Sequence, residues 1–260
     1  MKWCRFQAGN QVAYGTIEGN TVTAVDGSPF DSYTPTNSTY PLDTVKLLVP
    51  VIPPTFYAAG INYREHVTEI AKQRGEEPQF PPQADIGYRA NNALIATNEN
   101  IVIPKDATDV VQYEGELVVV MGKTCHKVSE DNVLDYVLGY TIGNDVSERT
   151  WQRGDRTLWR AKNTDTFKPM GPWIVTGLNP DDLHVSITLN GTEVYKYAIS
   201  GAIFGVRHFL SRMSQYLTLY PGDVVWMGTD GSSENLKHGD VVEIGIDGIG
   251  MLRNPIVREQ

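Results

Sequence analysis

The chain has 260 residues, which is enough to bury a full hydrophobic core and lies near the upper limit for a single domain. Its hydrophobic content of 41% and charged content of 20% are ordinary for a soluble globular protein. The formal net charge of -9 argues against non-specific binding to nucleic acid or to an anionic membrane surface, so we expect neither partner.

The sequence contains no pattern that predicts export or membrane insertion. It has no run of about 18 apolar residues, and the N-terminal residues MKWCRFQAGN lack the apolar stretch of a signal peptide. Cys4 and Cys125 are too few for a disulfide framework. We therefore expect a cytoplasmic protein.

Residues 1–50 predict a small β domain that precedes a larger domain over residues 51–260. The turn dipeptides Gly9-Asn10 and Gly19-Asn20 separate short runs of strand-forming residues. These runs predict strands over residues 2–8, 11–17 and 21–25. Residues 28–41 are rich in Pro, Ser, Thr and Tyr and predict a connector.

A strand over Phe56–Ala59 is followed by a predicted helix over residues 63–74, which ends at Gly75. Asn62 is the expected N-cap of this helix, because its side chain can accept a hydrogen bond from a free backbone N–H of the first turn. Glu65, three residues later, completes a pattern like a capping box.

His66 and Glu69 are three residues apart on this helix and therefore share one face. A carboxylate in that place could orient the imidazole and raise its basicity, as general base catalysis requires. The alternative is an ordinary pair on an exposed helix surface. The proline-rich segment 77–82 predicts an exposed, mobile loop, and a helix followed by such a loop could form a lid near a site.

Two neighbouring strands bring carboxylates together. Glu114 and Glu116 alternate along a predicted strand and so share one face. A second strand over residues 137–142 ends shortly before Asp145. Three hard oxygen ligands without His or Cys suit Mg²⁺ or Mn²⁺. The alternative is a solvated strand face, but Glu116 leads into an apolar run that predicts a central strand, where a bare carboxylate is costly.

Polar and cationic residues follow Asp145. Arg149, Gln152, Arg160 and Lys162 place guanidinium, amide and ammonium groups just beyond the candidate metal ligand. Each of them could also be a solvated loop residue. For Lys162 we expect partial burial, because it lies between Trp159 and the apolar stretch that follows.

The C-terminal third is β-rich. Strands over residues 185–189 and 194–197 flank Asn190-Gly191, a strong hairpin signal. Residues 202–216 predict an amphipathic helix. The expected core side of this helix consists of Phe204, Val206, Phe209, Leu210 and Met213.

Two similar segments, one with GDVV before MGTDG and the other with GDVV before IGIDG, predict two strand–turn units in one sheet. Many short strands and few helices indicate a mixed, β-rich α+β fold of the roll type.

The chain resembles the fumarylacetoacetate hydrolase family over roughly residues 45–257. The motifs that carry the resemblance stand in the family's order, and together they are specific. They are NYREHVTE (62–69), YEGELVVVMGK (113–123), GYTIGNDVSERTWQ (139–152), AKNTDTFKPMGPWI (161–174), PGDVVWMGTDG (221–231) and GDVVEIGIDGIGMLRNPI (239–256). The resemblance implies a β-sandwich roll, usually assembled as a homodimer, and the small N-terminal β module resembles that of longer members.

The resemblance also implies roles for particular residues. Metal ligands for Mg²⁺ or Mn²⁺, or else Ca²⁺, would be Glu114, Glu116 and Asp145. The residues that activate water would be His66 and Glu69. The residues that hold or stabilise the oxygens of a 2-oxo acid would be Arg149, Gln152 and Lys162, together with Gly228 and Thr229 of the loop that closes over the substrate carboxylate.

This sequence departs from the family pattern in that loop. Asp230 stands where the family usually has proline, and Ser232 and Ser233 also differ from the usual residues. Asp230 adds a negative charge beside the expected anion site, which argues against the usual acidic substrate.

The activity implied is hydrolytic cleavage of a C–C bond in a 2,4-dioxo acid such as an acylpyruvate, whose 2-oxo acid end a metal would chelate as an enolate. Two alternatives use the same site: decarboxylation of a β-keto acid such as oxaloacetate, and isomerisation or tautomerisation of a related 2-oxo acid. A further alternative is a non-catalytic metal- or ligand-binding protein that has kept the fold.

Overall fold

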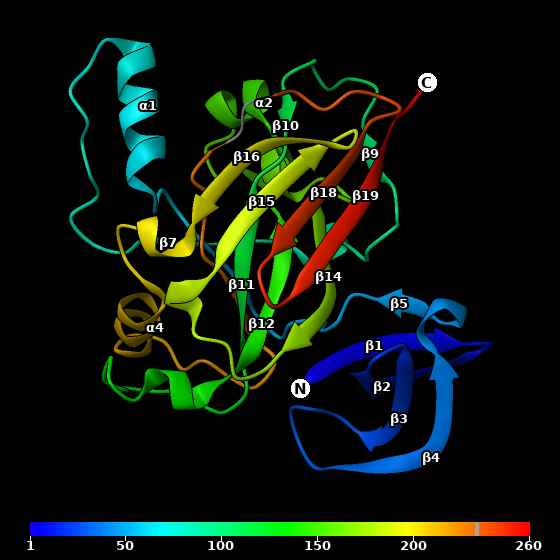
Figure 1. Cartoon of the computed structure of the whole chain (residues 1–260). Helices are drawn as coiled ribbons and strands as arrows, with labels where there is room; N and C mark the ends of the chain where they lie inside the picture. The colour runs from blue at the N-terminus through cyan, green and yellow to red at the C-terminus, as the bar shows by residue number, and fades with distance from the viewer. Residues whose placement is uncertain (232–233) are drawn as a thin grey trace.

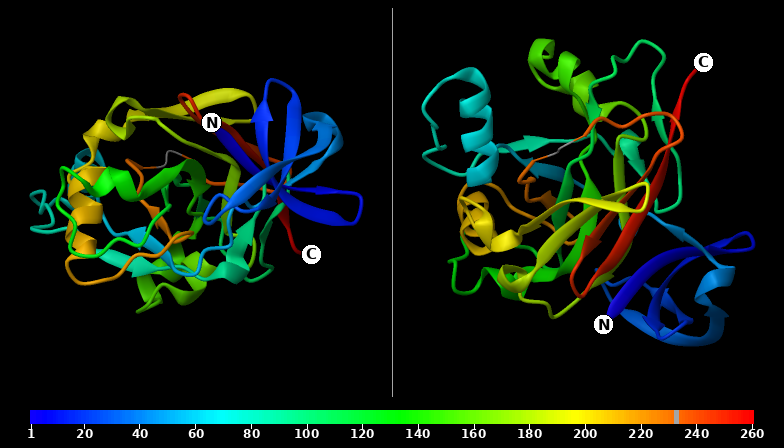
Figure 2. Two further views of the ribbon diagram at one scale, coloured as in Figure 1. Left: turned by 90° about the horizontal axis from the view of Figure 1, so that it is seen from below. Right: turned by 45° about the horizontal axis from the view of Figure 1, so that its top comes forward.

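The computed structural model describes residues 1–231 and 234–260, so Ser232 and Ser233 lie outside the described residues. Two β-sheets form the body of the molecule, and the N-terminal strands extend the larger sheet to one side (Figures 1 and 2). This arrangement confirms the predicted β-rich α+β fold.

The larger sheet joins the N-terminal strands to the main body. Its strands are β1 (Lys2–Ala8), β2 (Gln11–Glu18), β3 (Thr21–Gly27), β4 (Tyr33–Pro41), β5 (Lys46–Leu48), β6 (Phe56–Ala59), β7 (Ile86–Tyr88), β8 (Leu94–Ile95), β11 (Gly115–Met121), β12 (Val137–Asn144), β14 (Lys168–Val175) and β17 (Val224–Trp226). Their order in space is β4-β3-β2-β1-β14-β12-β11-β17-β6-β7, with β5 beside β1 and β8 beside β14.

The smaller sheet has the order β16-β15-β18-β19-β9, and β10 and β13 form a separate pair. These strands are β9 (Ile101–Ile103), β10 (Val111–Gln112), β13 (Ser147–Glu148), β15 (His184–Leu189), β16 (Thr192–Ala198), β18 (Val241–Ile246) and β19 (Gly250–Arg258). The predicted hairpin around Asn190-Gly191 is confirmed as the β15–β16 pair.

The helices lie around these sheets. They are α1 (Arg64–Arg74), α2 (Arg149–Gly154), α3 (Trp159–Asn163) and α4 (Val206–Ser214), with short 3-10 turns at Leu42–Thr44, Asn91–Ala93, Val133–Tyr136, Pro180–Asp182 and Ile199–Gly201. In Figure 1, α1 stands at the edge of the molecule, and the segment after it returns to β7. None of the described helices is long and apolar enough to cross a membrane.

Strand β11 is buried on both faces, which explains its run of apolar residues. Leu117 and Val119 belong to the main core, which also contains Ile187 of β15. Val118 and Val120 point to the other side, where they share a core with Trp226. The strand that carries Glu116 is therefore central, as predicted.

The prediction of a connector over residues 28–41 is wrong for its second half. Tyr33–Pro41 forms β4, which pairs with β3. Strand β4 lies at the edge of the sheet, where Pro35 and Pro41 are tolerated because a proline there need not donate a ladder hydrogen bond. Tyr and Thr, which predicted a loop through their polarity, are good strand residues.

The prediction of Asn62 as N-cap is also wrong. The cap position of α1 is Tyr63, and it contributes no side-chain hydrogen bond. The side chain of Asn62 instead donates to the carbonyl oxygens of Phe204 and Met227 and accepts the N–H of Phe204. These are distant in sequence, so the local pattern could not show that the side chain was already engaged.

Two further predictions need correction in the C-terminal third. The helix predicted over residues 202–216 is shorter, because Ile199–Gly201 forms a 3-10 turn and α4 begins only after Gly205. The two segments with GDVV lie in different sheets, since β17 belongs to the larger sheet and β18 to the smaller one. Similar local sequences therefore make similar strands without sharing a sheet.

Candidate active site

The three predicted metal ligands converge at one end of β11 and β12. Gly115 pairs with Asn144 across these antiparallel strands, so Glu114 and Asp145, the next residues on each chain, lie side by side. The backbone N–H of Asp145 donates to the carbonyl oxygen of Glu114 at 2.9 Å. Side-chain oxygens of Glu114, Glu116 and Asp145 all lie within 4.8 Å of one another, and all three residues are buried.

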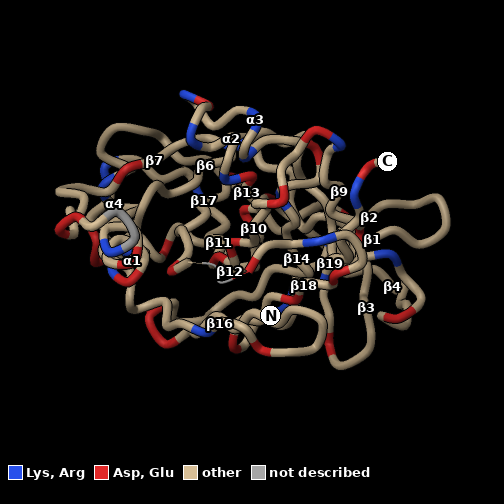
Figure 3. The backbone as a smooth tube through the Cα atoms, turned by 90° about the horizontal axis from the view of Figure 1, so that it is seen from above, with Lys and Arg blue, Asp and Glu red and all other residues tan. Residues whose placement is uncertain are grey.

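Cationic side chains contact two of these carboxylates. The ammonium of Lys162 lies 2.5 Å from Glu114 Oε2 and 2.9 Å from Asp145 Oδ2. The guanidinium of Arg149 lies 2.7 Å from Glu114 Oε1. Lys162 is buried, as its sequence position predicted. Figure 3 shows acidic and basic positions close together where β10, β11 and β13 meet.

Asp145 has two further partners that the sequence did not indicate. Arg89 contacts both carboxylate oxygens, with its closest nitrogen 2.8 Å from Oδ2. Lys168, which is fully buried, places its ammonium 2.7 Å from Oδ1 and donates to the carbonyl oxygens of Val146 and Phe167. Arg89 follows the short edge strand β7, and Lys168 is the first residue of β14. In the sequence, nothing distinguishes these two residues from solvent-exposed cations.

The charges around the carboxylates separate their pKa values. Burial would raise the pKa of Asp145, but Arg89, Lys162 and Lys168 together hold it well below its ordinary value. Burial, together with the neighbouring Asp145 and Glu114, raises the pKa of Glu116 to about 8, although Lys162 and the N–H of Gly228 oppose the shift. The hydrogen bond described for the Glu116 carboxylate comes from the backbone N–H of Gly228, at 2.8 Å.

These carboxylates fit a hard divalent cation. Oxygen ligands from three buried carboxylates, without nitrogen or sulfur, match the preference of Mg²⁺ and Mn²⁺. Glu116 is the carboxylate without a salt bridge among the described residues. A cation bound between the three would supply the positive charge that Glu116 lacks.

Buried carboxylates also fix the two short helices that carry the predicted substrate-binding residues. Glu148 accepts hydrogen bonds from the backbone N–H of Trp151 and from the side chain of Thr108, and so caps α2, which begins with Arg149. Asp155 accepts the backbone N–H groups of Arg160 and Ala161 and holds the first turn of α3, which carries Lys162. Short capped helices therefore fix the backbone positions of Arg149 and Lys162.

Arg149 is held in a defined orientation. Its Nε donates to Gln112 Oε1 at 2.8 Å, and one terminal nitrogen donates to Gln152 Oε1 at 2.9 Å. Together with the contact to Glu114, these bonds fix the plane of the guanidinium. A guanidinium fixed in this way suits two-pronged binding of a carboxylate.

The structure places His66 in the same cavity but leaves Glu69 exposed outside it. Burial lowers the pKa of His66, Arg149 and Lys162 lower it further, and Glu114 and Glu69 oppose this shift. No hydrogen bond joins His66 to Glu69 within the described residues, so Glu69 influences the imidazole by charge alone. The catalytic role of the pair remains a prediction.

The loop after β17 lines the cavity beside the carboxylates. Gly228 has a φ of 83°, a conformation that favours glycine, and this turn aims its N–H at Glu116. Thr229 is buried and lines the cavity beside Gly228. Asp230 does not line the cavity, so its charge does not face the position expected for a substrate anion.

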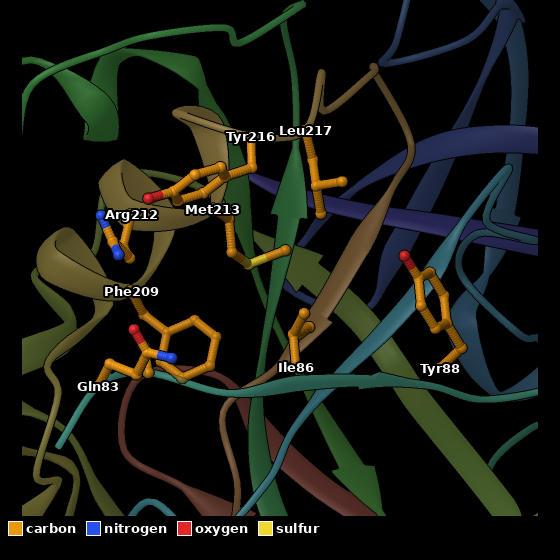
Figure 4. A pocket seen from close by; sticks show the side chains of 9 residues that line it. Gln83, Ile86, Tyr88, Phe209, Arg212, Met213, Tyr216 and Leu217 are labelled. Atoms are coloured by element: carbon orange, nitrogen blue, oxygen red, sulfur yellow. The ribbon is translucent and has the colours of Figure 1, made fainter. Parts of the chain in front are cut away.

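Every predicted site residue except Glu69 therefore lines one cavity of about 160 Å³. Its lining consists of Ala59, Gly60, Ile61, His66, Arg89, Glu114, Glu116, Asp145, Arg149, Gln152, Leu158, Lys162, Gly228 and Thr229. A second cavity, of about 410 Å³, lies between α4 and β7 and is lined mainly by apolar and aromatic side chains such as Phe209, Met213 and Tyr216 (Figure 4). The second cavity contains no carboxylate, so the first is the candidate active site.

Comparison with known proteins agrees with this site. The family model described as Fumarylacetoacetate (FAA) hydrolase C-terminal matches residues 55–257, and a model described as Rv2993c-like, N-terminal matches residues 1–50. A solved structure of 5-carboxymethyl-2-hydroxymuconate delta-isomerase from Mycobacterium smegmatis is similar over 100% of both chains, with 36% sequence identity and a TM-score of 0.90.

Two curated relatives carry other activities in their names. A 2,4-didehydro-3-deoxy-L-rhamnonate hydrolase from Sphingomonas sp. (strain SKA58) is 38% identical over 76% of this chain and 72% of its own. A 4-hydroxyphenylacetate degradation bifunctional isomerase/decarboxylase from Salmonella dublin is 34% identical over 79% of this chain and 47% of its own. Hydrolases, isomerases and decarboxylases thus share this architecture, and the chain described here belongs to the fumarylacetoacetate hydrolase family.

Proposed function

We propose that this protein is a divalent-metal-dependent hydrolase that cleaves a C–C bond of a 2,4-dioxo acid such as an acylpyruvate. One observation carries the proposal: His66, on the predicted lid helix, shares a single cavity with three buried carboxylates and the cations Arg149 and Lys162. Glu114, Glu116 and Asp145 would hold Mg²⁺ or Mn²⁺, with Ca²⁺ as a further candidate. The bound cation would supply Lewis-acid polarisation of the 2-oxo acid oxygens.

The residues of the chain would divide the remaining work. Arg149 and Gln152 bind the carboxylate and carbonyl oxygens of the 2-oxo acid end, and Thr229 and the N–H groups of its loop cover the carboxylate. His66 takes a proton from water as the water oxygen bonds to the 4-carbonyl carbon. The bond between carbons 3 and 4 then breaks, and its electron pair remains on carbon 3. Lys162 stabilises the negative charge that develops, and protonation of carbon 3 gives pyruvate beside the carboxylic acid.

The protonation state of His66 favours hydrolysis over the alternatives. Burial lowers its pKa, and Arg149 and Lys162 lower it further, so the imidazole is neutral at pH 7 and can accept a proton from water. Decarboxylation or isomerisation of a related oxo acid is the second candidate, because relatives named for these reactions are more than 30% identical to this chain. Arg149, Lys162 and the carboxylates would serve either reaction.

Product analysis tests the proposal. The purified protein, loaded with Mg²⁺ or Mn²⁺, receives acetylpyruvate and oxaloacetate in parallel, with EDTA controls, and pyruvate, acetate and CO₂ are counted. Metal-dependent formation of pyruvate and acetate in equal amounts is expected. Pyruvate and CO₂ from oxaloacetate above the metal-only background, without cleavage of acetylpyruvate, would move the assignment to decarboxylase.

Two further expectations accompany this function. We expect a homodimer, by analogy with the family, and light scattering of the purified protein tests it. We also expect the chain to divide near residue 50, and expression of residues 51–260 alone would show whether the larger part folds and binds metal without the first strands.

A further inference from the structure

Leu158, which lines the candidate active site, has an unusual backbone conformation. Its φ is 57°, in the left-handed region that glycine adopts freely and that other residues rarely adopt. The other described non-glycine residues with a positive φ are polar, namely Asn98, Lys127, Thr166 and Asn190. A leucine is less suited to this region than asparagine, because its side chain cannot form a local hydrogen bond there.

Hydrogen bonds hold Leu158 in this conformation. Its N–H donates to the carbonyl oxygen of Asp155 at 3.2 Å. Its carbonyl oxygen accepts the N–H of Lys162 and the side chain of Asn163, each at 3.1 Å. Strained residues that are fixed by their surroundings cluster at functional sites. The fold therefore keeps a leucine in a strained conformation four residues before Lys162, beside the carboxylates.

The side chain of Leu158 does not serve the hydrophobic core. It is half-buried, but it belongs to none of the three hydrophobic clusters that the described residues form. Ile61, which also lines the cavity, is 53% exposed and lies outside the same clusters. Two large hydrocarbon side chains thus border a site whose other large side chains are charged or polar.

The cations of the cavity are engaged with the candidate metal ligands. They are Arg89, Arg149 and Lys162, and each lies 2.9 Å or less from an oxygen of Glu114 or Asp145. In the proposed function, these groups and the metal face the 2-oxo acid end of the substrate. A second carboxylate farther along the substrate would instead meet the two hydrocarbon side chains, and burial of a charge against such groups is costly.

We propose that Leu158 and Ile61 form the subsite for the part of the substrate beyond carbon 4, and that this subsite selects an uncharged hydrocarbon acyl group over one that ends in a second carboxylate. The inference rests on the proposed function, because it requires the charged groups to bind the 2-oxo acid end. The acyl group is short, since the cavity of about 160 Å³ is smaller than the roughly 300–1,000 Å³ of sites for drug-sized ligands.

A matched pair of unreactive 2-oxo acids tests the subsite without catalysis. The tails of 5-methyl-2-oxohexanoate and 2-oxoglutarate have the same shape, and they end in an isopropyl group and in a carboxylate. Neither acid has a 4-carbonyl group that water could attack. Calorimetry with the Mg²⁺-loaded parent protein should give a Kd about tenfold lower for 5-methyl-2-oxohexanoate. Equal or tighter binding of 2-oxoglutarate would overturn the inference.

Variants that remove the leucine test whether it causes this selectivity. Leu158→Gly relieves the backbone and deletes the side chain, so it should remove most of the tenfold preference while the Tm stays equal or rises. Leu158→Asn, whose side chain tolerates the same backbone, should lose the preference as well. An unchanged preference in both variants would refute the role of Leu158. A lower Tm in Leu158→Gly would show that the leucine is kept for stability, and would count against the subsite.

A gain of function gives the sharpest comparison. Leu158→Arg places a cation in the subsite and should make 2-oxoglutarate the tighter ligand. Thr157→Arg is the matched control, because it adds the same charge at an exposed neighbour that does not line the cavity, and the ratio of the two Kd values should stay as in the parent. An equal shift in the two arginine variants would indicate a general effect of charge and would overturn the inference.

Steady-state kinetics separates this inference from the proposed function. The acyl groups of 4-methylpentanoylpyruvate and succinylpyruvate differ in the same way as the two tails, and kcat/KM should be about tenfold higher for the uncharged one. Selective binding of the 2-oxo acids without cleavage of either acylpyruvate would leave the subsite standing and refute only the function. Equal cleavage of both would support the function and refute the subsite. If the metal-loaded parent binds neither 2-oxo acid, both proposals fail together.

Discussion

Replacement of Lys168 by methionine should destabilise the protein strongly, although this lysine does not line the cavity. Its ammonium is fully buried and makes contacts of 2.7 Å to Asp145 Oδ1, 2.9 Å to the carbonyl oxygen of Val146 and 2.8 Å to that of Phe167. Methionine has a similar length and fills the volume, so cavity formation contributes little. The loss then comes from the contact with Asp145 and from the hydrogen bonds to the two carbonyl oxygens.

The size of the effect follows from what remains around Asp145. Removal of one partner of a buried ion pair typically costs about 3–5 kcal/mol. Because Arg89 and Lys162 still contact Asp145, we expect the lower end of this range, about 3 kcal/mol in the free energy of unfolding. Urea unfolding at pH 6.5 measures it. Lys196→Met, at an exposed lysine of β16, is the matched control and should change the free energy by less than about 0.5 kcal/mol.

The pH dependence gives a second check on the same residue. Burial, opposed by Asp145 and assisted by Arg89 and Lys162, lowers the pKa of Lys168 from 10.5 to about 7 in the folded protein. Between these two pH values the unfolded chain binds the proton more tightly than the folded one, so the parent protein should gain stability as the pH rises from about 7 towards 10.5. Lys168→Met should lack this gain. A loss below about 1 kcal/mol at pH 6.5, or the same rise with pH in both proteins, would refute the reasoning.

Three further predictions concern the candidate site. Glu116→Gln should abolish the rise in Tm that Mg²⁺ produces and EDTA reverses, and an unchanged Mg²⁺ response would contradict the assignment of Glu116 as a metal ligand. Without metal, the variant should be at least as stable as the parent protein, because the pKa of Glu116 is raised to about 8, chiefly by burial. His66→Ala should lower kcat by about a hundredfold or more with metal binding intact, and near-normal hydrolysis by the variant would rule out His66 as the base. In the parent protein, kcat/KM should fall as the pH drops through the lowered pKa of His66, because only the neutral imidazole accepts a proton. Arg89→Lys keeps the charge but loses the two-pronged contact to Asp145, so urea unfolding should show a loss of about 2 kcal/mol, and full stability would show that charge alone suffices.

The carboxylates could be found from sequence because local rules place them. Alternation along a strand puts Glu114 and Glu116 on one side, and the apolar run after Glu116 indicates a central strand. Asp145 ends the neighbouring strand, so pairing of two consecutive strands is enough to bring the three together. The volume of the cavity and the partners of each carboxylate could not be predicted in this way, because they depend on the whole fold.

Arg89 and Lys168 could not be found in this way. Arg89 reaches Asp145 because β7 pairs with β6, which in turn lies beside β17 and β11 in the larger sheet. Lys168 is buried because β14 pairs with β12. Both burials depend on strand neighbours that are distant in sequence, while the residue types by themselves predict solvated charges. The same reason explains Asn62, whose side-chain partners Phe204 and Met227 lie on other segments.

The groups of the cavity differ in how firmly the fold holds them, and this bears on the reaction. Glu114, Glu116, Asp145 and Lys162 come from buried strands or capped helices, and every family reaction that needs a polarised 2-oxo acid can use them. His66 comes instead from α1, a helix at the edge of the molecule whose outer face is exposed. Hydrolysis alone requires a base placed beside an attacking water. The step that separates hydrolysis from decarboxylation or isomerisation therefore depends on an exposed helix at the edge of the molecule, so small changes in α1 can alter the reaction while the metal ligands stay the same.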